Sequence, residues 1–488
     1  MSVESNRSRL EDSLHQLRCH FTWELQIEDD EMHDLENRVF DQMEFLDTQC
    51  GMHNLLAYVK HLEGRDEEAL GSLRDAEEAM PQEHGHGPDV KSLVTWGNLA
   101  WLCYHTGRLA ETQSYLDKVE AICRKFSGQS SYRMESPEMD SEEGWALLKC
   151  GAKNYERAEA CFEKALEAQP ENPEFSAGYA IVIYRLDGIN RTSLSLQPLQ
   201  KALRLNPENV YVKVLLALKL QDLRQEAEAE KHIEEALSST SSQTYVLRYA
   251  GKFYRRKGFL DKALHLFKMA LQATPSSALL NHQIGLCYRA HVLRIKKAAN
   301  WKPRALDREK VEKIARLAIR HLEFAVEQKP TFGIAHVHLA EMYTETGNYR
   351  KAEETYHKVL NMTSLKEEKL QEVHFQYGRF QEFQRKSEVD AIVHYLKAIK
   401  IETPSFSRNK SIQSLEKLAL RRLQRNALDA EGLSFLGLIC KLRGDLSEAV
   451  GQYERALRLL AGRPQEGDSH SPQGEGPPAR DRSTGGGR

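Results

Sequence analysis

Apolar residues recur at helical spacing along almost the whole chain, and small and aromatic residues recur with them at a longer period. Gly251 is followed by Ala263 and Phe267, and similar arrangements begin at Ala340 and Gly437. Apolar positions three or four apart predict α-helices, and a period of about 34 residues predicts pairs of antiparallel helices. The small residue lets two helix axes approach, and the aromatic side chain fills the space beside them.

This period is that of tetratricopeptide repeats. We expect an all-α fold, a tetratricopeptide-repeat superhelix, that is, a helical solenoid of about nine or ten repeats plus extra helices around a groove or tunnel. Residues 5–48 are expected to form helices ahead of the first repeat, and residues 408–428 one more between the last two. The repeats are predicted at 52–85, 93–127, 138–171, 174–207, 209–241, 242–275, 276–330, 331–364, 369–402 and 430–462.

One repeat, at 276–330, is longer than the others. The extra residues, roughly 291–312, include Trp301 and Pro303, and we expect them to lengthen the helices or add one and to form a structural pivot. The tail from Arg463 is rich in Gly, Pro, Ser and charge, which is typical of disorder. The predicted domains are an N-terminal repeat subdomain at 1–240, central basic repeats with the pivot at 241–330, a C-terminal repeat subdomain at 331–462, and the tail at 463–488.

A strongly basic block lies in the middle of the chain. Residues 236–306 contain one acidic residue, Asp261, and thirteen lysines and arginines, a net charge of +12, whereas the whole chain is −3. The remainder is therefore acidic. A positive centre inside an acidic chain indicates a site for a negatively charged partner rich in phosphate.

The repeat register places part of this charge on one surface. Helical solenoids bind ligands on the concave face that the first helix of each repeat lines. In the 242–275 repeat, spacings of three and four put one aromatic and three basic residues on that face, and the neighbouring repeats add others. These residues are Tyr211, Tyr245, Arg248, Lys252, Arg255, His282 and Arg289.

Phosphate suits such a surface because arginine offers paired hydrogen bonds and lysine a point charge. Tyrosine rings offer flat surfaces for bases, and proteins recognise RNA largely through its ends and unpaired bases. The pattern therefore predicts a groove for single-stranded RNA. The alternative is a solvated basic helix face, on which the repulsion between like charges has no compensation.

Other functional classes have little support. The chain shows no glycine-rich phosphate loop, nucleophile motif or set of metal ligands, so we predict neither an enzyme nor a cofactor or metal site. None of the eight cysteines forms a C-x-x-C pair, which favours reduced thiols. Without an apolar run of about 20 residues or a signal peptide, we expect no membrane association and a cytoplasmic location.

Several long motifs identify a family. Residues 17–25, LRCHFTWEL, and 53–58, HNLLAY, resemble the interferon-induced proteins with tetratricopeptide repeats. So do residues 34–39, 45–48, 143–150 and 253–258, and the similarity runs from about residue 10 to 460. Among members, the chain resembles most the first, cap-binding one and its close paralogue.

The resemblance implies an antiviral protein that binds the 5′ end of non-self RNA, a cap lacking 2′-O-methylation or a triphosphate, and blocks its translation. It implies cap binding by Trp145, Leu46, Thr48, Glu174 and Ile181, with the indole stacked on the cap guanine. Arg38, Lys149 and Arg185 are implied to grip the 5′ phosphates. The groove residues implied are Gln42, Tyr155, Tyr211, Arg248, Arg255, His282, Gln283 and Lys329.

The resemblance also implies association with other chains. Tyr453 and Leu457 match a motif for self-association or association with related members, whereas the repeat pattern alone makes Tyr453 a packing aromatic. The translation initiation machinery is a further implied partner. An alternative function is a protein-interaction scaffold, which is the usual role of these repeats, with an acidic peptide end in the basic groove.

Overall fold

The chain is described by a computed structural model that covers residues 3–27, 35–36, 39, 49–84, 92–126, 131–190, 195–239, 243–363 and 365–462. All regular elements in these ranges are helical, as the sequence predicts. The chain divides into two compact units, residues 1–364 and 365–488, which are described separately. Among the described helices, none has the length and apolar character required to cross a membrane.

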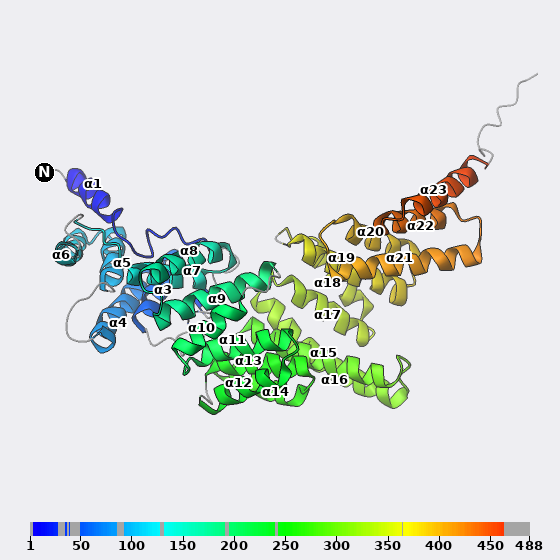
Figure 1. The fold of residues 1–488 in the computed structure, drawn as a ribbon, viewed down its shortest axis with the longest axis horizontal. Coiled ribbons are helices and arrows are strands. Elements are labelled where there is room, and N and C mark those ends of the chain that lie inside the picture. The colour runs from blue at the N-terminus through cyan, green and yellow to red at the C-terminus, as the bar shows by residue number, and fades with distance from the viewer. Residues whose placement is uncertain are drawn as a thin grey trace, which may run out of the picture. The chain divides into compact units, whose positions relative to one another are not determined.

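The first unit is built from paired antiparallel helices (Figure 1). The first helix of each pair also lies against the first helix of the next, so that α7, α9, α11, α13 and α15 form one continuous layer. The helices are α1 (Val3–Leu14), α3 (Gln49–Leu62), α4 (Asp66–His84), α5 (Ser92–His105), α6 (Leu109–Phe126), α7 (Pro137–Cys150), α8 (Tyr155–Ala168), α9 (Pro173–Asn190), α10 (Leu196–Leu205), α11 (Val210–Asp222), α12 (Glu226–Ser239), α13 (Thr244–Lys257), α14 (Leu260–Ala273), α15 (Ala278–Ala298), α16 (Ala305–Gln328), α17 (Gly333–Glu345) and α18 (Tyr349–Leu360), with a short 3-10 helix at Ala152–Asn154.

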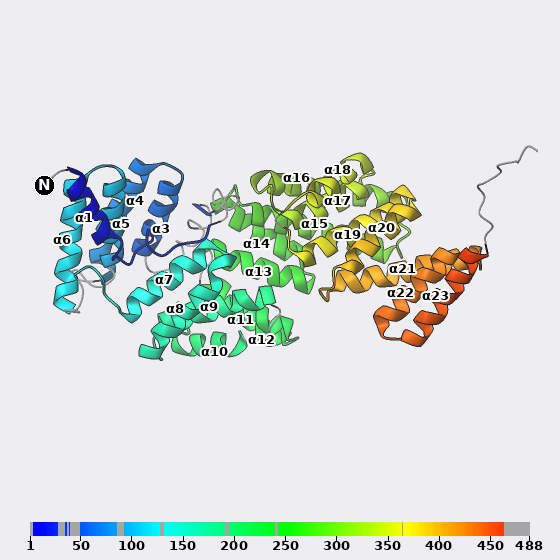
Figure 2. The same ribbon diagram turned by 90° about the horizontal axis from the view of Figure 1, so that it is seen from above.

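The second unit has two further pairs and one extra helix between them (Figure 2). Its own core joins Phe375, Tyr395, Leu415 and Phe435. The elements are α19 (Glu367–Phe380), a π-helical turn (Gln381–Arg385), α20 (Glu388–Lys400), α21 (Phe406–Arg425), α22 (Ala430–Arg443) and α23 (Leu446–Ala461). The helices α17 and α18, assigned from the sequence to a C-terminal part, group with the first unit. The predicted subdivision at 240 and 330 stays a prediction.

Small and aromatic residues meet where the helices of a pair cross. A Cβ atom on Gly251 of α13 would lie 2.7 Å from the ring of Phe267 on α14, so only glycine permits this approach. Gly437 and Tyr453 make the same contact in the last pair, at 2.9 Å. The repeated small and aromatic residues of the sequence therefore mark the positions where paired helices cross.

The segment before the first repeat is less helical than predicted. After α1, residues 15–27 form turns rather than a second helix. Thr22 donates a hydrogen bond to the carbonyl of Leu17, and Arg157 of α8 donates to the carbonyl of Trp23 at 2.7 Å. These contacts replace helical hydrogen bonds and tie the segment to a later repeat. Residues 28–34 lie outside the described part.

The insertion in the seventh repeat lengthens its helices. α15 has 21 residues and α16 has 24, whereas α13 and α14 have 14 each. The two long helices extend as a hairpin past the end of the neighbouring α13–α14 pair (Figure 1). Lengthening of the helices was one of the two outcomes expected from the sequence. The role of this hairpin as a pivot stays a prediction.

Candidate nucleic-acid interface

The layer of first helices gathers basic and aromatic side chains from five repeats. Arg185 is on α9, Tyr211 on α11, Arg248 on α13 and Gln283 on α15, while Tyr155 begins α8 beside them. We call this set the tyrosine–arginine cluster. Its members are Tyr155, Arg185, Tyr211, Tyr245, Arg248, Tyr249, Lys252, Arg255, His282 and Gln283.

Arg185 lies at the centre of this cluster. Its two terminal nitrogens donate to the hydroxyls of Tyr155, at 3.3 Å, and Tyr211, at 3.1 Å. Its Nε is buried and has no hydrogen-bond partner. Burial opposes its charge, but the neighbouring Tyr211, Tyr249 and Tyr155 raise the pKa of Arg185 well above its ordinary value. Arg185 is therefore a buried, charged donor with one unused N–H.

Three tyrosines pack around the cations of α13. The rings of Tyr211 and Tyr245 meet edge to face with centroids 3.8 Å apart, and Tyr249 lies 4.5 Å from Tyr245. The guanidinium of Arg248 lies 4.9 Å from the Tyr245 ring and 5.1 Å from the Tyr249 ring. Such cation–π contacts fix the direction of the arginine without cancelling its charge.

The cluster continues onto α15. Arg255 donates from Nε to the amide oxygen of Gln283 at 3.2 Å. His282 lies with Nε2 at 3.0 Å from Nδ1 of His338 on α17, and its ring packs on Phe332. Polar contacts thus run from Tyr155 in the third repeat to His338 in the eighth.

In the part of the chain that the structure describes, no acidic side chain is named among the charges that act on Arg185, Lys252 and Arg255. Among the described residues, no carboxylate forms an ion pair with Arg185, Arg248 or Lys252, nor with Arg255. Cations that are partly removed from water and lack a counter-ion are costly, so a bound anion would stabilise the cluster.

Burial and charge repulsion alter the protonation of the cluster. Burial, together with the positive charges of Arg256 and Arg255, lowers the pKa of Lys252 to about 8. Burial alone raises the pKa of Tyr249, but Arg185 and Arg248 outweigh it and lower this pKa to about 8. Two groups therefore change charge slightly above neutral pH, and both changes make the site less positive as pH rises.

A cavity of about 600 Å³ opens beside these groups. Arg185, Tyr249 and Lys252 line one part of it. The ion pairs Asp187–Lys219, at 2.9 Å, and Asp222–Arg256, at 2.8 Å, also line it. Since those pairs are internally neutral, the excess positive charge of the cavity comes from the cluster.

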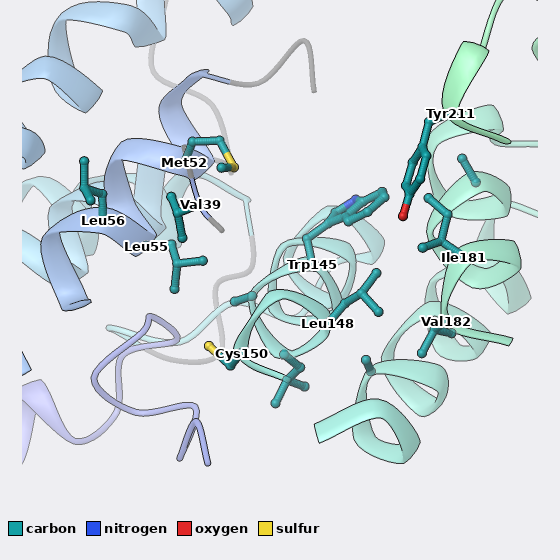
Figure 3. Close-up of a cluster of buried hydrophobic side chains, with 14 of the residues drawn as sticks. Val39, Met52, Leu55, Leu56, Trp145, Leu148, Cys150, Ile181, Val182 and Tyr211 are labelled. Atoms are coloured by element: carbon teal, nitrogen blue, oxygen red, sulfur yellow. The ribbon is translucent and has the colours of Figure 1, made fainter. Parts of the chain in front are cut away.

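Trp145 lies at the other end of the layer, on α7. Figure 3 shows its indole reaching from α7 towards Ile181 of α9 and Tyr211 of α11. The side chain is 9% exposed and packs edge to face on Phe162 with centroids 5.3 Å apart. One turn later, Lys149 is buried and its Nζ lies 2.9 Å from Sδ of Met52, on α3. Burial lowers the pKa of Lys149 to about 8.

The remaining predicted residues fall into three groups. Glu174, at the start of α9, and Lys329, just after α16, are half-buried. Arg289 forms an ion pair with Glu341 of α17 at 2.5 Å, so its charge is compensated, unlike the charges of Arg248 and Arg255. Four predicted residues lie outside the described part of the chain: Arg38, Gln42, Leu46 and Thr48. Their roles stay predictions.

Two tyrosines of α13 add to the sequence expectation. Tyr245, expected on the ligand face, is only 1% exposed and meets the ring of Tyr211 edge to face, so its contact with a ligand stays a prediction. Tyr249 was not selected, yet it lies between Arg185, Arg248 and Lys252. Its position, four residues after Tyr245 and three before Lys252, is on the same helical face and could have revealed it.

In the second unit, Tyr453 and Leu457 have different surroundings. Tyr453 packs on Gly437, as the repeat pattern predicts, whereas Leu457 is 64% exposed. Val450, 56% exposed, and Leu460, 55% exposed, lie on the same helix α23. An exposed apolar surface of this kind is typical of an interface with another chain.

The fold and the cluster together define a class, a tetratricopeptide-repeat protein with an uncompensated basic and aromatic ligand face. Comparisons with known proteins agree on the repeats. Residues 144–210 and 335–370 match the tetratricopeptide repeat, and residues 182–300 match the Psidin N-terminal TPR repeats region.

Relatives place the chain more closely. It is 64% identical over 468 residues to the antiviral innate immune response effector IFIT1 of Homo sapiens, covering 94% of this chain and 98% of that protein. It is 44% identical to interferon-induced protein with tetratricopeptide repeats 2 of Homo sapiens, covering 93% and 96%. The chain belongs to the family of interferon-induced proteins with tetratricopeptide repeats.

Solved structures agree with this assignment. A monomeric mutant of IFIT1 with Gppp-AAAA has a TM-score of 0.88 and 65% identity, covering 92% of this chain and 100% of that one. The human IFIT1 dimer with PPP-AAAA has a TM-score of 0.82 and 63% identity, covering 93% and 100%.

The protonation of the cluster predicts how RNA binding depends on pH. Between pH 7 and pH 9, Lys149 and Lys252 lose positive charge and Tyr249 gains negative charge. We expect the affinity for 5′-triphosphate RNA to fall about tenfold over this range, with proton uptake on binding near pH 8. Calorimetry in buffers of different ionisation enthalpy measures both quantities. The variant Tyr249→Phe should show a shallower fall, and an unchanged profile would contradict the assignment.

Proposed function

We propose that this protein recognises the 5′ end of single-stranded non-self RNA, either a cap lacking 2′-O-methylation or a triphosphate, and inhibits translation of that RNA as an interferon-induced antiviral effector. The observation that carries the proposal is Arg185, buried, held by two tyrosine hydroxyls and without a carboxylate partner. A terminal phosphate supplies the missing anion and an acceptor for its unused Nε–H.

The arrangement supports a division of tasks along the layer of first helices. Trp145 and Ile181 offer an apolar wall for a cap base, and Arg185 with Lys149 offers charge for the phosphates beyond it. Arg248, Lys252 and Arg255 then follow the first nucleotides, with tyrosine rings beside them. The relatives solved with Gppp-AAAA and PPP-AAAA support a capped or triphosphate 5′ end as the ligand.

The proposal includes a cytoplasmic location and no enzymatic activity, since binding alone withholds an RNA end from translation. Translation initiation factors are proposed partners, because inhibition of translation acts at the RNA end that they use. The human relative is a dimer, and we propose that Leu457 and its exposed neighbours on α23 form the corresponding contact here.

A panel of RNAs that differ only at the 5′ end tests the proposal. The panel contains a cap without ribose methylation, the same cap with 2′-O-methylation, a triphosphate and a hydroxyl on one unstructured sequence. We expect the hydroxyl RNA to bind at least tenfold more weakly than the triphosphate RNA, because it lacks the charge that Arg185 receives.

Equal affinity for all four RNAs would rule out recognition of the 5′ end. Purification of the protein from interferon-treated cells, with and without nuclease, separates the scaffold alternative. A partner protein that stays bound after nuclease treatment, with no RNA recovered, would favour the scaffold.

A further inference from the structure

The tip of the α15–α16 hairpin carries charge that the cluster does not use. Between Arg294 and Arg304 there are five cationic residues and no acidic one. Arg294, Lys297, Lys302 and Arg304 are exposed. Only Lys296 among the five has a carboxylate partner in the described part of the chain, Glu345 of α17 at 2.7 Å.

An exposed tryptophan lies in the middle of these cations. Trp301 is 58% exposed, and Nζ of Lys296 lies 5.7 Å from its ring centroid. The next exposed apolar side chain, Leu306, is 63% exposed and begins the following helix. A large aromatic surface left in water and surrounded by positive charge indicates a contact with another molecule.

The backbone at the tip is held in an unfavourable conformation. Asn300 has φ 48° and Trp301 has φ 60°, in the left-handed region that a bulky side chain rarely adopts. The N–H of Trp301 donates to the carbonyl of Lys296 at 2.8 Å, which closes the end of α15. Glycine would fit this position at lower cost, so the bulky side chain of Trp301 stands on an unfavourable backbone.

We propose that the hairpin tip is a second contact for the same RNA, one that holds the single-stranded body of the message downstream of its 5′ end. The proposal rests on the proposed function and extends it. An unpaired base stacks on the Trp301 ring, and Lys297, Lys302 and Arg304 contact the neighbouring phosphates. Single-strand binders combine these two features and accept any sequence.

The cluster and the hairpin tip lie on the same helix and within the same basic block, which favours RNA over other partners. α15 carries Gln283 and His282 of the cluster in its first half and the tip at its end, and Arg289 lies between them. From Gln283 to Lys297 the helix rises about 21 Å. Both sites belong to the basic block of residues 236–306, so one extended polyanion can neutralise the two together.

Binding of short and long RNAs tests the inference. A 4-nucleotide and a 20-nucleotide unstructured RNA, both with a 5′ triphosphate, are titrated into the full chain at several salt concentrations. We expect the longer RNA to bind about five- to tenfold tighter and with a steeper salt dependence, since each added phosphate contact adds about 0.7 to the slope.

Variants at the tip show whether the higher affinity of the long RNA comes from the tip. Trp301→Ala and the double variant Lys302→Glu with Arg304→Glu should remove the advantage of the long RNA and leave the affinity for the short one within about twofold. Arg350→Glu, at a side chain 90% exposed on α18, is the matched charge control and should change neither. A 5′-hydroxyl 20-nucleotide RNA should also bind these tip variants more weakly than the unaltered chain.

Each other outcome counts against the inference. Equal affinity for short and long RNAs, or an equal loss of both in Trp301→Ala, would overturn it. A membrane role for the tip would also overturn it. In that case the unaltered chain would bind vesicles of phosphatidylcholine and phosphatidylserine, and the tip variants would lose this binding while their affinity for RNA stayed unchanged. Failure of the proposed function gives a different result, because triphosphate and hydroxyl RNAs of one length would then bind equally.

Discussion

Replacing Arg185 with methionine is expected to lower the affinity for triphosphate RNA and for capped RNA alike, by about 100-fold or more. The side chain is buried, and its charge faces tyrosine hydroxyls rather than carboxylates. Loss of a desolvated charge that contacts phosphate costs about 3 kcal/mol of binding free energy. Methionine fills similar space without charge. Fluorescence anisotropy with labelled RNAs measures the change.

Two further variants show whether the loss of affinity in Arg185→Met comes from the lost phosphate contact. Arg185→Lys keeps the charge but loses the two-pronged donor, so an intermediate affinity is expected. Arg124→Met changes an arginine that is 71% exposed on α6, and it should leave RNA binding unchanged. If Arg185→Met bound triphosphate RNA as well as the unaltered chain, Arg185 would not be the phosphate contact.

Replacing Trp145 with alanine is expected to separate the two kinds of RNA end. Affinity for capped RNA should fall about 10- to 100-fold, because stacking of a cationic base on the indole contributes about 1–3 kcal/mol. Affinity for triphosphate RNA should change much less, since that RNA has no cap base to stack on the indole. The ratio of the two affinities, rather than either alone, is the informative measurement.

Packing must be controlled in this experiment. Trp145 is buried against Phe162, so alanine also leaves a cavity, whereas Trp145→Phe keeps an aromatic ring in place. Trp96→Phe on α5, at a tryptophan of similar burial, tests for general destabilisation. Thermal unfolding is measured for each variant. A parallel loss of affinity for both RNAs in Trp145→Phe would show that the indole does not distinguish caps.

Much of the fold could be read from the chain because each repeat is a local structure. Gly251 and Phe267 are sixteen positions apart, and their contact is set within one helix pair. The register of the pairs therefore followed from spacing alone. The turns at 15–27 could not be predicted in this way, because Arg157 and Asn154 hold them from a later repeat.

The site was only partly predictable for the same reason. The spacing along α13 identified Arg248, Lys252 and Arg255 as one face, and the structure keeps them without carboxylate partners among the described residues. Arg289 belonged to the same pattern, but Glu341 of α17 compensates it. An ion pair across 52 positions leaves no periodic signal in the sequence.

The sequence by itself determined the helical repeats, the basic centre and, through its motifs, the family. Only the tertiary structure decided which charges are left uncompensated. Arg185 is one arginine among many until Tyr155, Tyr211 and Tyr249 surround it from three other helices. The physical reason is that helix pairing depends on nearby residues, whereas burial and the choice of counter-ion depend on which repeats come to lie side by side.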